Sequence, residues 1–389
     1  MKRLEIWRLF RLADPRSPGQ RVDLPLNWLP RRNTLIQNCK SVSIQRSLLL
    51  KMNRHRIATL DLVRLIGMLL VMLRHSAVGT DGESTLAIFL LHNFISAGAV
   101  PVFFLLSGYL GARKLDSAAL TFRDFAREKT RTYIVPYLFW NVLVLLLVLV
   151  AKMTPLAAHF RGGGTYFNVE LTASSIVSAL FGIGRNPIVF QFWFLRDLIV
   201  VSLVAWFLCR VGPRIPLLPW LFFFIPLPMA SSLGYYLLGY QLHGWFPPEK
   251  YPTCRASLLY AGCWFLMGIC VFVGSADIPV PLLPLGSAAF ILMLAIVFSS
   301  APLGRWLAVL GPATFFIYAT HEPLQTTLAK SWQIANLPFY GSLFCFLVIP
   351  AIVFVVLVAS YLALSRMCPR LMAIATGERE WHKEAGQRQ

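Results

Sequence analysis

The sequence is poor in charge and poorest in acidic residues. Only 14% of its 389 residues are charged, whereas soluble domains carry roughly a quarter. Asp and Glu number 17 against 36 Lys and Arg, and 57% of the residues are hydrophobic. A chain this apolar, with a mean hydropathy of +0.63, is not an ordinary soluble domain, and its apolar runs predict helices that cross a bilayer.

Several signatures of other protein classes are missing. The seven cysteines form no CxxC pair and predict no disulfide framework. No HExxH motif and no close His/Cys set is present, so we expect no metal site. A GxSxG elbow and a P-loop are absent too. The N-terminal region lacks an apolar core followed by a small-residue cleavage site, so we expect no signal peptide. We find no internal repeat of the kind that marks many transporters.

Ten apolar segments predict an all-α, polytopic membrane protein with about ten transmembrane helices. Eight are clear and two, at 215–229 and 233–246, are weaker because the first is rich in proline and the second is short. The eight clear candidates are 57–78, 88–110, 133–150, 190–208, 256–273, 280–298, 306–328 and 341–364.

The distribution of basic residues predicts that both termini are cytoplasmic. Residues 1–56 hold thirteen Lys and Arg against three Asp and Glu, and the tail is basic as well. Positive residues stay on the cytoplasmic side of a membrane, and an even number of spans satisfies both ends. The net charge of +19 is therefore explained by topology and by anionic membrane lipids, and we expect no nucleic-acid partner.

Three regions follow from this layout. Residues 1–52 are predicted to be a basic, disordered cytoplasmic leader, or an over-extended start upstream of Met52. Residues 53–366 form the transmembrane domain, and 367–389 form a basic cytoplasmic tail. The 111–132 connection is expected inside and the long 151–189 segment outside.

Ionisable residues in the first span are the leading candidates for function, because charges within a membrane are costly. Arg64 and His75 are eleven residues apart, which puts them within about 20° of the same helix face and about 16 Å apart along the axis. Asp61 shares that face and forms an expected ion pair with Arg64 at i, i+3. That pair alone explains Asp61, whereas His75 has no partner within its own span.

Other polar residues lie at comparable depths in later spans. Toward the outside they form a supporting polar cluster, and toward the inside Ser107 and Tyr109 end the second span, next to the basic connection. The outer cluster comprises Arg196, Asp197, His321 and Glu322.

This set of residues suits acyl transfer to a hydroxyl. Histidine can remove the hydroxyl proton, because its ordinary pKa is close to working pH. Arginine can stabilise a developing oxyanion or bind phosphate. The basic connection could hold the phosphates of a nucleotide-bearing thioester, although positive-inside topology alone also accounts for it.

Five motifs follow one another along the chain. They are Arg64-x10-His75, Phe103-Phe104-x-x-Ser107-Gly108-Tyr109, Ile134-Val135-Pro136-Tyr137-x-x-Trp140, Trp193-Phe194-Leu195-Arg196-Asp197-Leu198 and Gly311-x-x-Thr314-Phe315-x-Ile317-Tyr318-x-x-His321. Their order resembles the acyltransferase-3 family of membrane O-acyltransferases, which acylate bacterial surface polysaccharides. The resemblance covers about residues 54–365, and the motifs together are more specific than any one alone.

The resemblance implies catalysis by His75 with Arg64, and cytoplasmic acyl-CoA, usually acetyl-CoA, as co-substrate rather than as a bound cofactor. Ser107 and Tyr109 are the expected donor-binding residues, with Arg127, Lys129 and Arg131. The family's Arg-x-x-Arg pattern is not kept here, since Arg127 and Arg131 are four residues apart. The implied acceptor is a cell-surface or lipid-linked carbohydrate, the implied location is the bacterial inner membrane, and proteins of polysaccharide synthesis are candidate partners.

Two other interpretations remain open from the sequence. The intramembrane charges could relay protons in a transporter or flippase for a lipid-linked sugar, although no repeat supports this. A glycan polymerase or ligase would normally carry a larger outer loop than 151–189. Dependence on acyl-CoA distinguishes the acyltransferase from both.

Overall fold

A computed structural model describes residues 58–76, 85–116, 120–153, 172–211, 215–227, 229–245, 253–274, 278, 282–338 and 342–377. Within these ranges all the regular structure is helical, which agrees with the predicted fold class. The chain divides into two units, 1–54 and 55–389, and the described residues all belong to the second. The predicted leader and the end of the basic tail lie outside the described residues.

Six of the described helical segments are long and apolar enough to cross a membrane, which makes the chain a multi-pass membrane protein. They are Leu86–Ala112, Phe122–Lys152, Phe190–Arg210, Cys254–Phe272, Leu282–Ser300 and Leu343–Met367. All six contain or closely match a predicted span. The total of about ten spans and the side on which the termini lie stay predictions.

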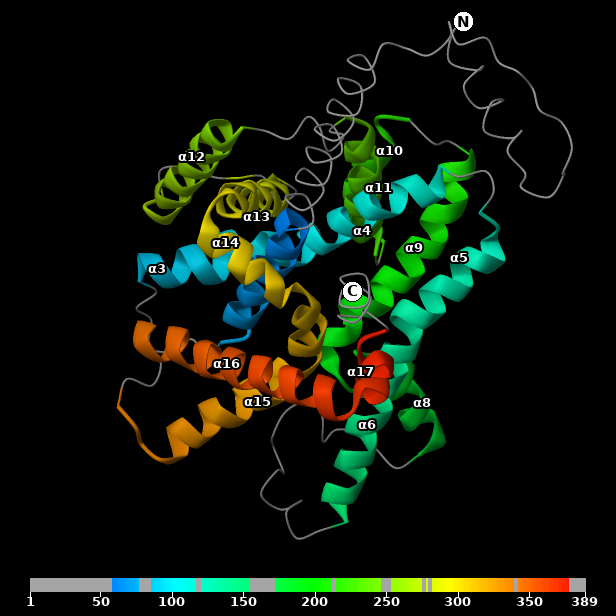
Figure 1. The fold of residues 1–389 in the computed structure, drawn as a ribbon, viewed down its shortest axis with the longest axis vertical. Coiled ribbons are helices and arrows are strands. Elements are labelled where there is room, and N and C mark those ends of the chain that lie inside the picture. Colours follow the sequence, from blue (N-terminus) through cyan, green and yellow to red (C-terminus); the bar gives the residue numbers. More distant parts are fainter. Residues whose placement is uncertain are drawn as a thin grey trace, which may run out of the picture. The chain divides into compact units, whose positions relative to one another are not determined.

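These segments are built from the elements labelled in Figure 1. A helix over 58–74 comes first. It is followed by α3 (Leu86–Ile88), η2 (Phe89–Ile95), η3 (Ser96–Gly98), α4 (Ala99–Leu115), α5 (Phe122–Lys129), η4 (Thr130–Ile134), α6 (Val135–Lys152), α8 (Ala173–Phe181), η5 (Phe190–Phe192), α9 (Trp193–Val211), α10 (Leu218–Phe224), α11 (Ala230–Trp245), α12 (Cys254–Phe272), α13 (Leu282–Ser300), α14 (Pro302–Leu307), η7 (Ala308–Ala313), α15 (Thr314–Ile334), α16 (Leu343–Met367) and α17 (Pro369–Thr376).

Two predicted spans differ from the observed helices because of proline. The 215–229 segment contains only the seven-residue α10, since proline removes a backbone donor and cannot continue a helix. The predicted span at 306–328 is broken into α14, η7 and α15, with Pro312 inside η7. The break places Gly311 and Thr314 at a bend rather than in the middle of a straight helix.

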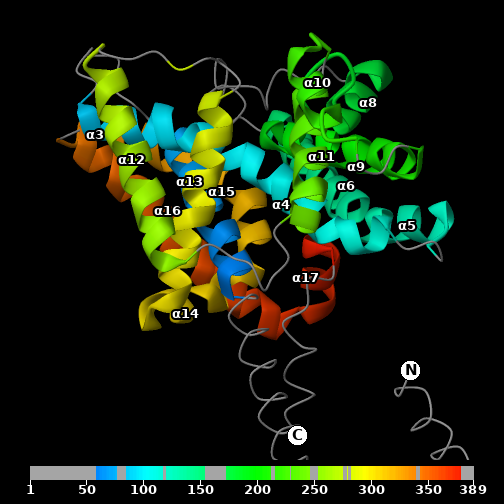
Figure 2. The ribbon, with the colours of Figure 1, turned by 90° about the horizontal axis from the view of Figure 1, so that it is seen from above.

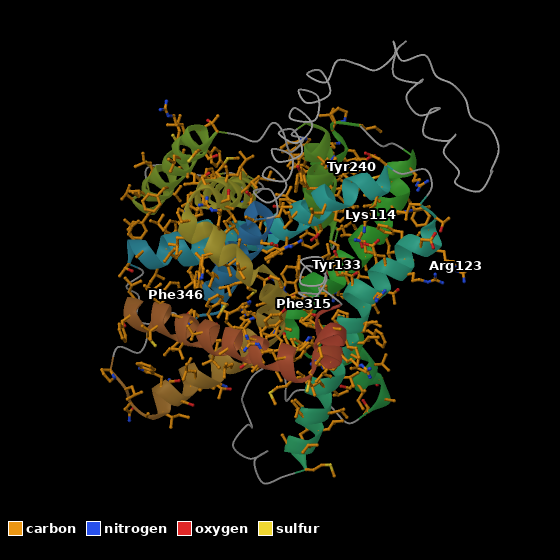
Figure 3. The ribbon with its side chains drawn as sticks, in the orientation of Figure 1. Lys114, Arg123, Tyr133, Tyr240, Phe315 and Phe346 are labelled. Carbon is orange, nitrogen blue, oxygen red and sulfur yellow. The ribbon has the colours of Figure 1, made fainter. Side chains whose placement is uncertain are left out.

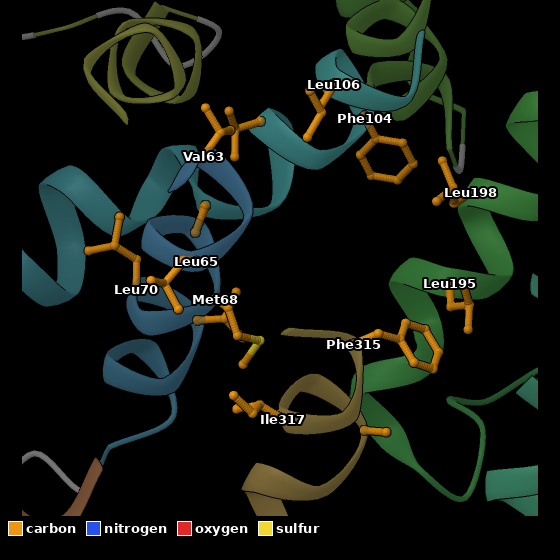
Figure 4. Close-up of a cluster of buried hydrophobic side chains, with 14 of the residues drawn as sticks. Val63, Leu65, Met68, Leu70, Phe104, Leu106, Leu195, Leu198, Phe315 and Ile317 are labelled. Atoms are coloured by element: carbon orange, nitrogen blue, oxygen red, sulfur yellow. The ribbon is translucent and has the colours of Figure 1, made fainter. Parts of the chain in front are cut away.

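The elements pack as neighbouring helix pairs around a shared apolar core. α4 contacts α11 most extensively, α12 lies along α13, and α15 along α16, as Figures 1 and 2 show. Figure 4 shows the core side chains Met68, Leu106, Leu195 and Phe315, which come from the 58–74 helix, α4, α9 and α15 respectively. The 58–74 helix, α4, α9 and α15 all contribute to the wall of the cavity described in the next subsection.

Two π-helical segments interrupt the regular helices. η2 follows α3, and η4 joins α5 to α6 without a break. A π-helical turn widens the backbone and changes which side chains face a neighbour, and such turns are frequent at functional sites. η4 borders the cavity described below, and η2 contacts Arg74, next to His75.

Candidate active site

The first helix holds an ion pair at the Arg64 end. Arg64 Nη1 lies 2.7 Å from Asp61 Oδ1, which confirms the expected i, i+3 pair. Gly311 of η7 lies directly over Asp61, and a Cβ at that glycine would be 2.6 Å from the Cβ of Asp61. The glycine of the Gly311-x-x-Thr314 motif thus lets the bend of the broken helix approach the ion pair.

The ion pair forms part of the wall of a cavity of about 490 Å³. Its wall comes from the first helix, α4, α5, η4, α9, η7 and α15. Its polar lining residues are Asp61, Arg64, Ser107, Lys114, Glu128, Lys129, Thr132, Tyr133, Thr314 and Tyr318, and its apolar ones include Met68, Phe103, Leu106, Phe194, Leu195, Leu198 and Phe315. Figure 4 shows Met68, Leu106, Leu195, Leu198 and Phe315 around this space.

One basic residue of the 111–132 connection is buried in the wall of this cavity. Lys129 is 8% exposed, and its Nζ lies 5.1 Å from the ring centroid of Phe125 and 4.8 Å from that of Tyr133. Lys114 instead pairs with Glu128 at 2.5 Å. Lys129 has no carboxylate partner among the described residues, so a bound anion would supply the missing charge. Figure 3 shows Lys114, Tyr133 and Phe315 in this region.

The other expected donor-binding residues divide between the cavity and the surface. Ser107 lines the cavity. Tyr109, two residues on, does not line it; its ring lies 5.2 Å from that of His243. Arg127 and Arg131 are exposed and are not part of the cavity wall. The structure therefore brings Ser107, Lys129 and Arg64 together around one space.

A pair of histidines lies at the opposite end of the first helix. The ring of His75 is 5.6 Å from that of His321 and 5.3 Å, edge-on, from Phe190 (centroid distances). His321 is fully buried, and its Nδ1 lies 2.9 Å from the main-chain oxygen of Tyr318 and 3.2 Å from that of Ile317. Carbonyl oxygens only accept, so Nδ1 carries the proton and Nε2 of the neutral ring is an acceptor.

Two glutamines that the sequence analysis did not select also belong to this end. Gln325 Nε2 donates to the main-chain oxygen of Met72 at 2.9 Å, which ties α15 to the first helix. Gln191 Nε2 donates to the oxygen of Ala319 at 3.3 Å. The sequence signal for Gln191 was its position as a single polar residue within the aromatic run at 190–194.

Glu322, the residue after His321, accepts a hydrogen bond from Thr326 at 2.9 Å.

Arg196 and Asp197 form a second ion pair that holds the segment before α9. Arg196 Nη2 lies 2.9 Å from Asp197 Oδ1, and Arg196 Nη1 donates to the oxygen of Gly182 at 2.7 Å. Gly182 ends α8 with a φ of 68°, which favours glycine. The pair thereby fixes the chain that leads to Phe190 and its contact with His75.

The cavity and the histidine pair are separate in this structure. Neither His75 nor His321 lines the cavity, whereas Tyr318, whose ring is 6.4 Å from His321, does. Tyr318 donates to the main-chain oxygen of Gln191 at 2.5 Å and stacks on Phe192 at 5.5 Å. Tyr318 therefore lies between an anion-suited cavity and a pair of histidines, an arrangement suited to transfer of a group from a large anionic carrier.

Comparison with known proteins identifies the class of enzyme. The family model for the acyltransferase-3 family, described as "Acyltransferase domain", matches residues 57–364. The chain therefore belongs to this family and is a membrane O-acyltransferase. It is 27% identical over 315 residues to the succinoglycan biosynthesis protein ExoH of Rhizobium meliloti (strain 1021), an alignment that covers 76% of this chain and 82% of that protein. No solved structure matches the chain.

Proposed function

We propose that this protein transfers an acyl group from acyl-CoA to a hydroxyl of a cell-surface or lipid-linked carbohydrate at the bacterial inner membrane. The observation that carries the proposal is a cavity whose wall contains the buried Lys129 and the Arg64–Asp61 ion pair. His75 does not line this cavity. The relative from Rhizobium meliloti is named for the biosynthesis of a polysaccharide, which supports a carbohydrate acceptor. Acetyl-CoA is the expected donor.

The cavity suits the donor because its cations can contact phosphate groups. Lys129 lacks a carboxylate partner among the described residues, and Arg64 presents a planar guanidinium that can form two parallel hydrogen bonds with phosphate. The apolar wall around Met68 and Phe315 suits the uncharged part of the donor. Arg64 lines this cavity and lies about 16 Å along the helix axis from His75. Arg64 thus acts on the donor rather than as a direct partner of His75.

His75 acts on the acceptor. It removes the proton from the acceptor hydroxyl as the oxygen attacks the thioester carbonyl, and the carbon–sulfur bond then breaks. The proton on His75 passes to the departing thiolate, so the ester and free CoA form with no other reactant. General base catalysis of this kind contributes about 10²–10⁴-fold to the rate.

The test is transfer of radiolabelled acetyl or succinyl groups from CoA to glycan in membranes that contain the protein. His75→Ala should lower transfer by about 10²–10⁴-fold, and Arg64→Ala should raise the KM for acyl-CoA. His243→Ala, a histidine on α11, is the matched control and should retain activity at equal membrane levels. Wild-type membranes that transfer neither group, or full activity in His75→Ala, would contradict the proposal.

A further inference from the structure

Three buried acceptor atoms that lack a hydrogen-bond partner among the described residues belong to residues at the His75 end of the first helix. His321 is 0% exposed, Gln325 1% and Gln191 2%. The unsatisfied atoms are His321 Nε2, Gln325 Oε1 and Gln191 Oε1, which have no partner among the described residues. An unsatisfied acceptor in the interior costs free energy, so three in one region indicate a ligand.

The neighbouring backbone fixes these atoms as acceptors. The NH₂ groups of both glutamines donate to main-chain oxygens, Met72 for Gln325 and Ala319 for Gln191. Turning either amide over would place oxygen against oxygen, so each Oε1 must be the atom left over. The same logic applies to His321, because its Nδ1 faces two carbonyl oxygens.

A proline creates one of these fixed positions. Pro323 lies inside α15 and has no N–H to donate to the oxygen of Ala319, four residues earlier. Gln191 supplies the missing donor. The Ala319 oxygen within α15 thus orients a side chain from η5, and Gln191 Oε1 is left without a partner among the described residues.

The three residues are linked to His75 in different ways. The ring of His321 contacts it directly at 5.6 Å between centroids. Gln325 donates a hydrogen bond to the main-chain oxygen of Met72, which also accepts from the N–H of His75 at 3.2 Å. Gln191 follows Phe190, whose ring is 5.3 Å from that of His75. The acceptors thus come from two elements, α15 and η5.

We propose that His321, Gln325 and Gln191 form a hydroxyl-binding subsite for the carbohydrate acceptor. A sugar presents several O–H donors, and the three acceptor atoms are neutral, which suits a neutral polyol. One hydroxyl faces His75 and loses its proton there, while neighbouring hydroxyls donate to the subsite and orient the ring. This inference rests on the proposed function and assigns the residues that recognise its acceptor.

Binding of a glycoside without any acyl donor tests the subsite. The probes are radiolabelled octyl β-D-glucopyranoside and its galactose and mannose counterparts, titrated into the full chain in lipid nanodiscs. His321→Asn keeps an N–H donor at the Nδ1 position and removes the Nε2 acceptor. It should weaken binding about threefold to tenfold, the effect of one neutral hydrogen bond. His321→Gln restores an acceptor near the Nε2 position and should recover part of the affinity.

Gln241→Met is the matched control for Gln325→Met. Gln241 on α11 also donates to a main-chain oxygen, that of Ile215 at 2.8 Å, and also leaves a buried Oε1 without a partner among the described residues. Gln325→Met should weaken binding to the same degree as His321→Asn, whereas Gln241→Met should bind as wild type. The KM for acyl-CoA should stay unchanged in all three variants.

The binding experiment separates this inference from the proposed function. Equal binding by wild type and His321→Asn, or no binding of any of the three glycosides by wild type, refutes the subsite even if acyl transfer is found. Binding that depends on His321 and Gln325, in a protein that transfers no acyl group from CoA, supports the subsite and refutes the proposed function.

Discussion

Gly108 lies where the backbones of α4 and α11 touch, and replacing it tests both packing and function. A Cβ on Gly108 would be 1.9 Å from the main-chain oxygen of Tyr236, and a Cβ on Gly239 of α11 would be 2.0 Å from that of Leu105. Two reciprocal glycines therefore hold the closest helix pair together, as small residues do in membrane helix interfaces. Gly108 also follows Ser107, which lines the cavity.

The expected loss of stability in Gly108→Ala follows from this close contact between α4 and α11. Main-chain oxygens cannot rotate away, so Gly108→Ala must move α4 and α11 apart by about 1.5 Å to reach ordinary contact. A gap of even ~0.5–1 Å forfeits about a quarter to a half of each contact's attraction. Overpacking usually costs about 1–3 kcal/mol. Because this is the most extensive helix pair, we expect about 3 kcal/mol.

The assay is the apparent melting temperature of the purified protein, read as the monodisperse fraction left after heating. Gly108→Ala should melt below wild type and show a raised KM for acyl-CoA, because Ser107 moves with α4. Gly244→Ala is the control on α11, since a Cβ there meets nothing within 4 Å. Equal melting temperatures for Gly108→Ala and Gly244→Ala would refute the packing argument.

Two further substitutions probe the cavity and the second ion pair. Lys129→Ala should raise the KM for acyl-CoA about tenfold or more by removing a charged contact. Arg123 is exposed on α5 (Figure 3), so Arg123→Ala should leave that KM unchanged. Equal effects of the two variants on the KM would contradict the assignment of Lys129 to the donor. Arg196→Met should lower stability by about 3 kcal/mol, because it leaves buried Asp197 unpaired. Adding Asp197→Asn should recover part of the melting temperature, and no recovery would show that the pair is not the cause.

Apolar runs predicted most of the membrane helices but not their interruptions. The predicted span 88–110 appears within Leu86–Ala112, and 280–298 closely matches Leu282–Ser300. Such runs are predictable because lipid requires continuous helices with apolar side chains. The division of 306–328 is a local effect of Pro312 that a hydropathy window averages out.

The same limits apply to the site. Helix periodicity predicted the Asp61–Arg64 pair, which the structure confirms, whereas the shared face of Arg64 and His75 stays a prediction. Periodicity could not select among Arg127, Lys129 and Arg131, because the difference between them arises from packing: Lys129 is buried against Phe125 and Tyr133, whereas the two arginines are exposed. The sequence carried no signal for Gln325, and for Gln191 only its place as a polar residue in an aromatic run, because the contacts of both join elements that are distant in the sequence.

The separation of the cavity from the histidine pair constrains how the enzyme can work. Under the proposed function, an acyl group held beside Arg64 and Lys129 would pass Tyr318 on its way to His75. Tyr318 donates a hydrogen bond to the main-chain oxygen of Gln191, has a further hydrogen bond with the backbone of Leu195, and makes ring contacts with Phe192, Phe194 and Phe315. Gln191 is also one of the three proposed acceptor-binding residues. On that proposal, binding of a sugar at Gln191 would act on the residue whose main-chain oxygen accepts from Tyr318, and it would couple the arrival of the acceptor to access of the donor.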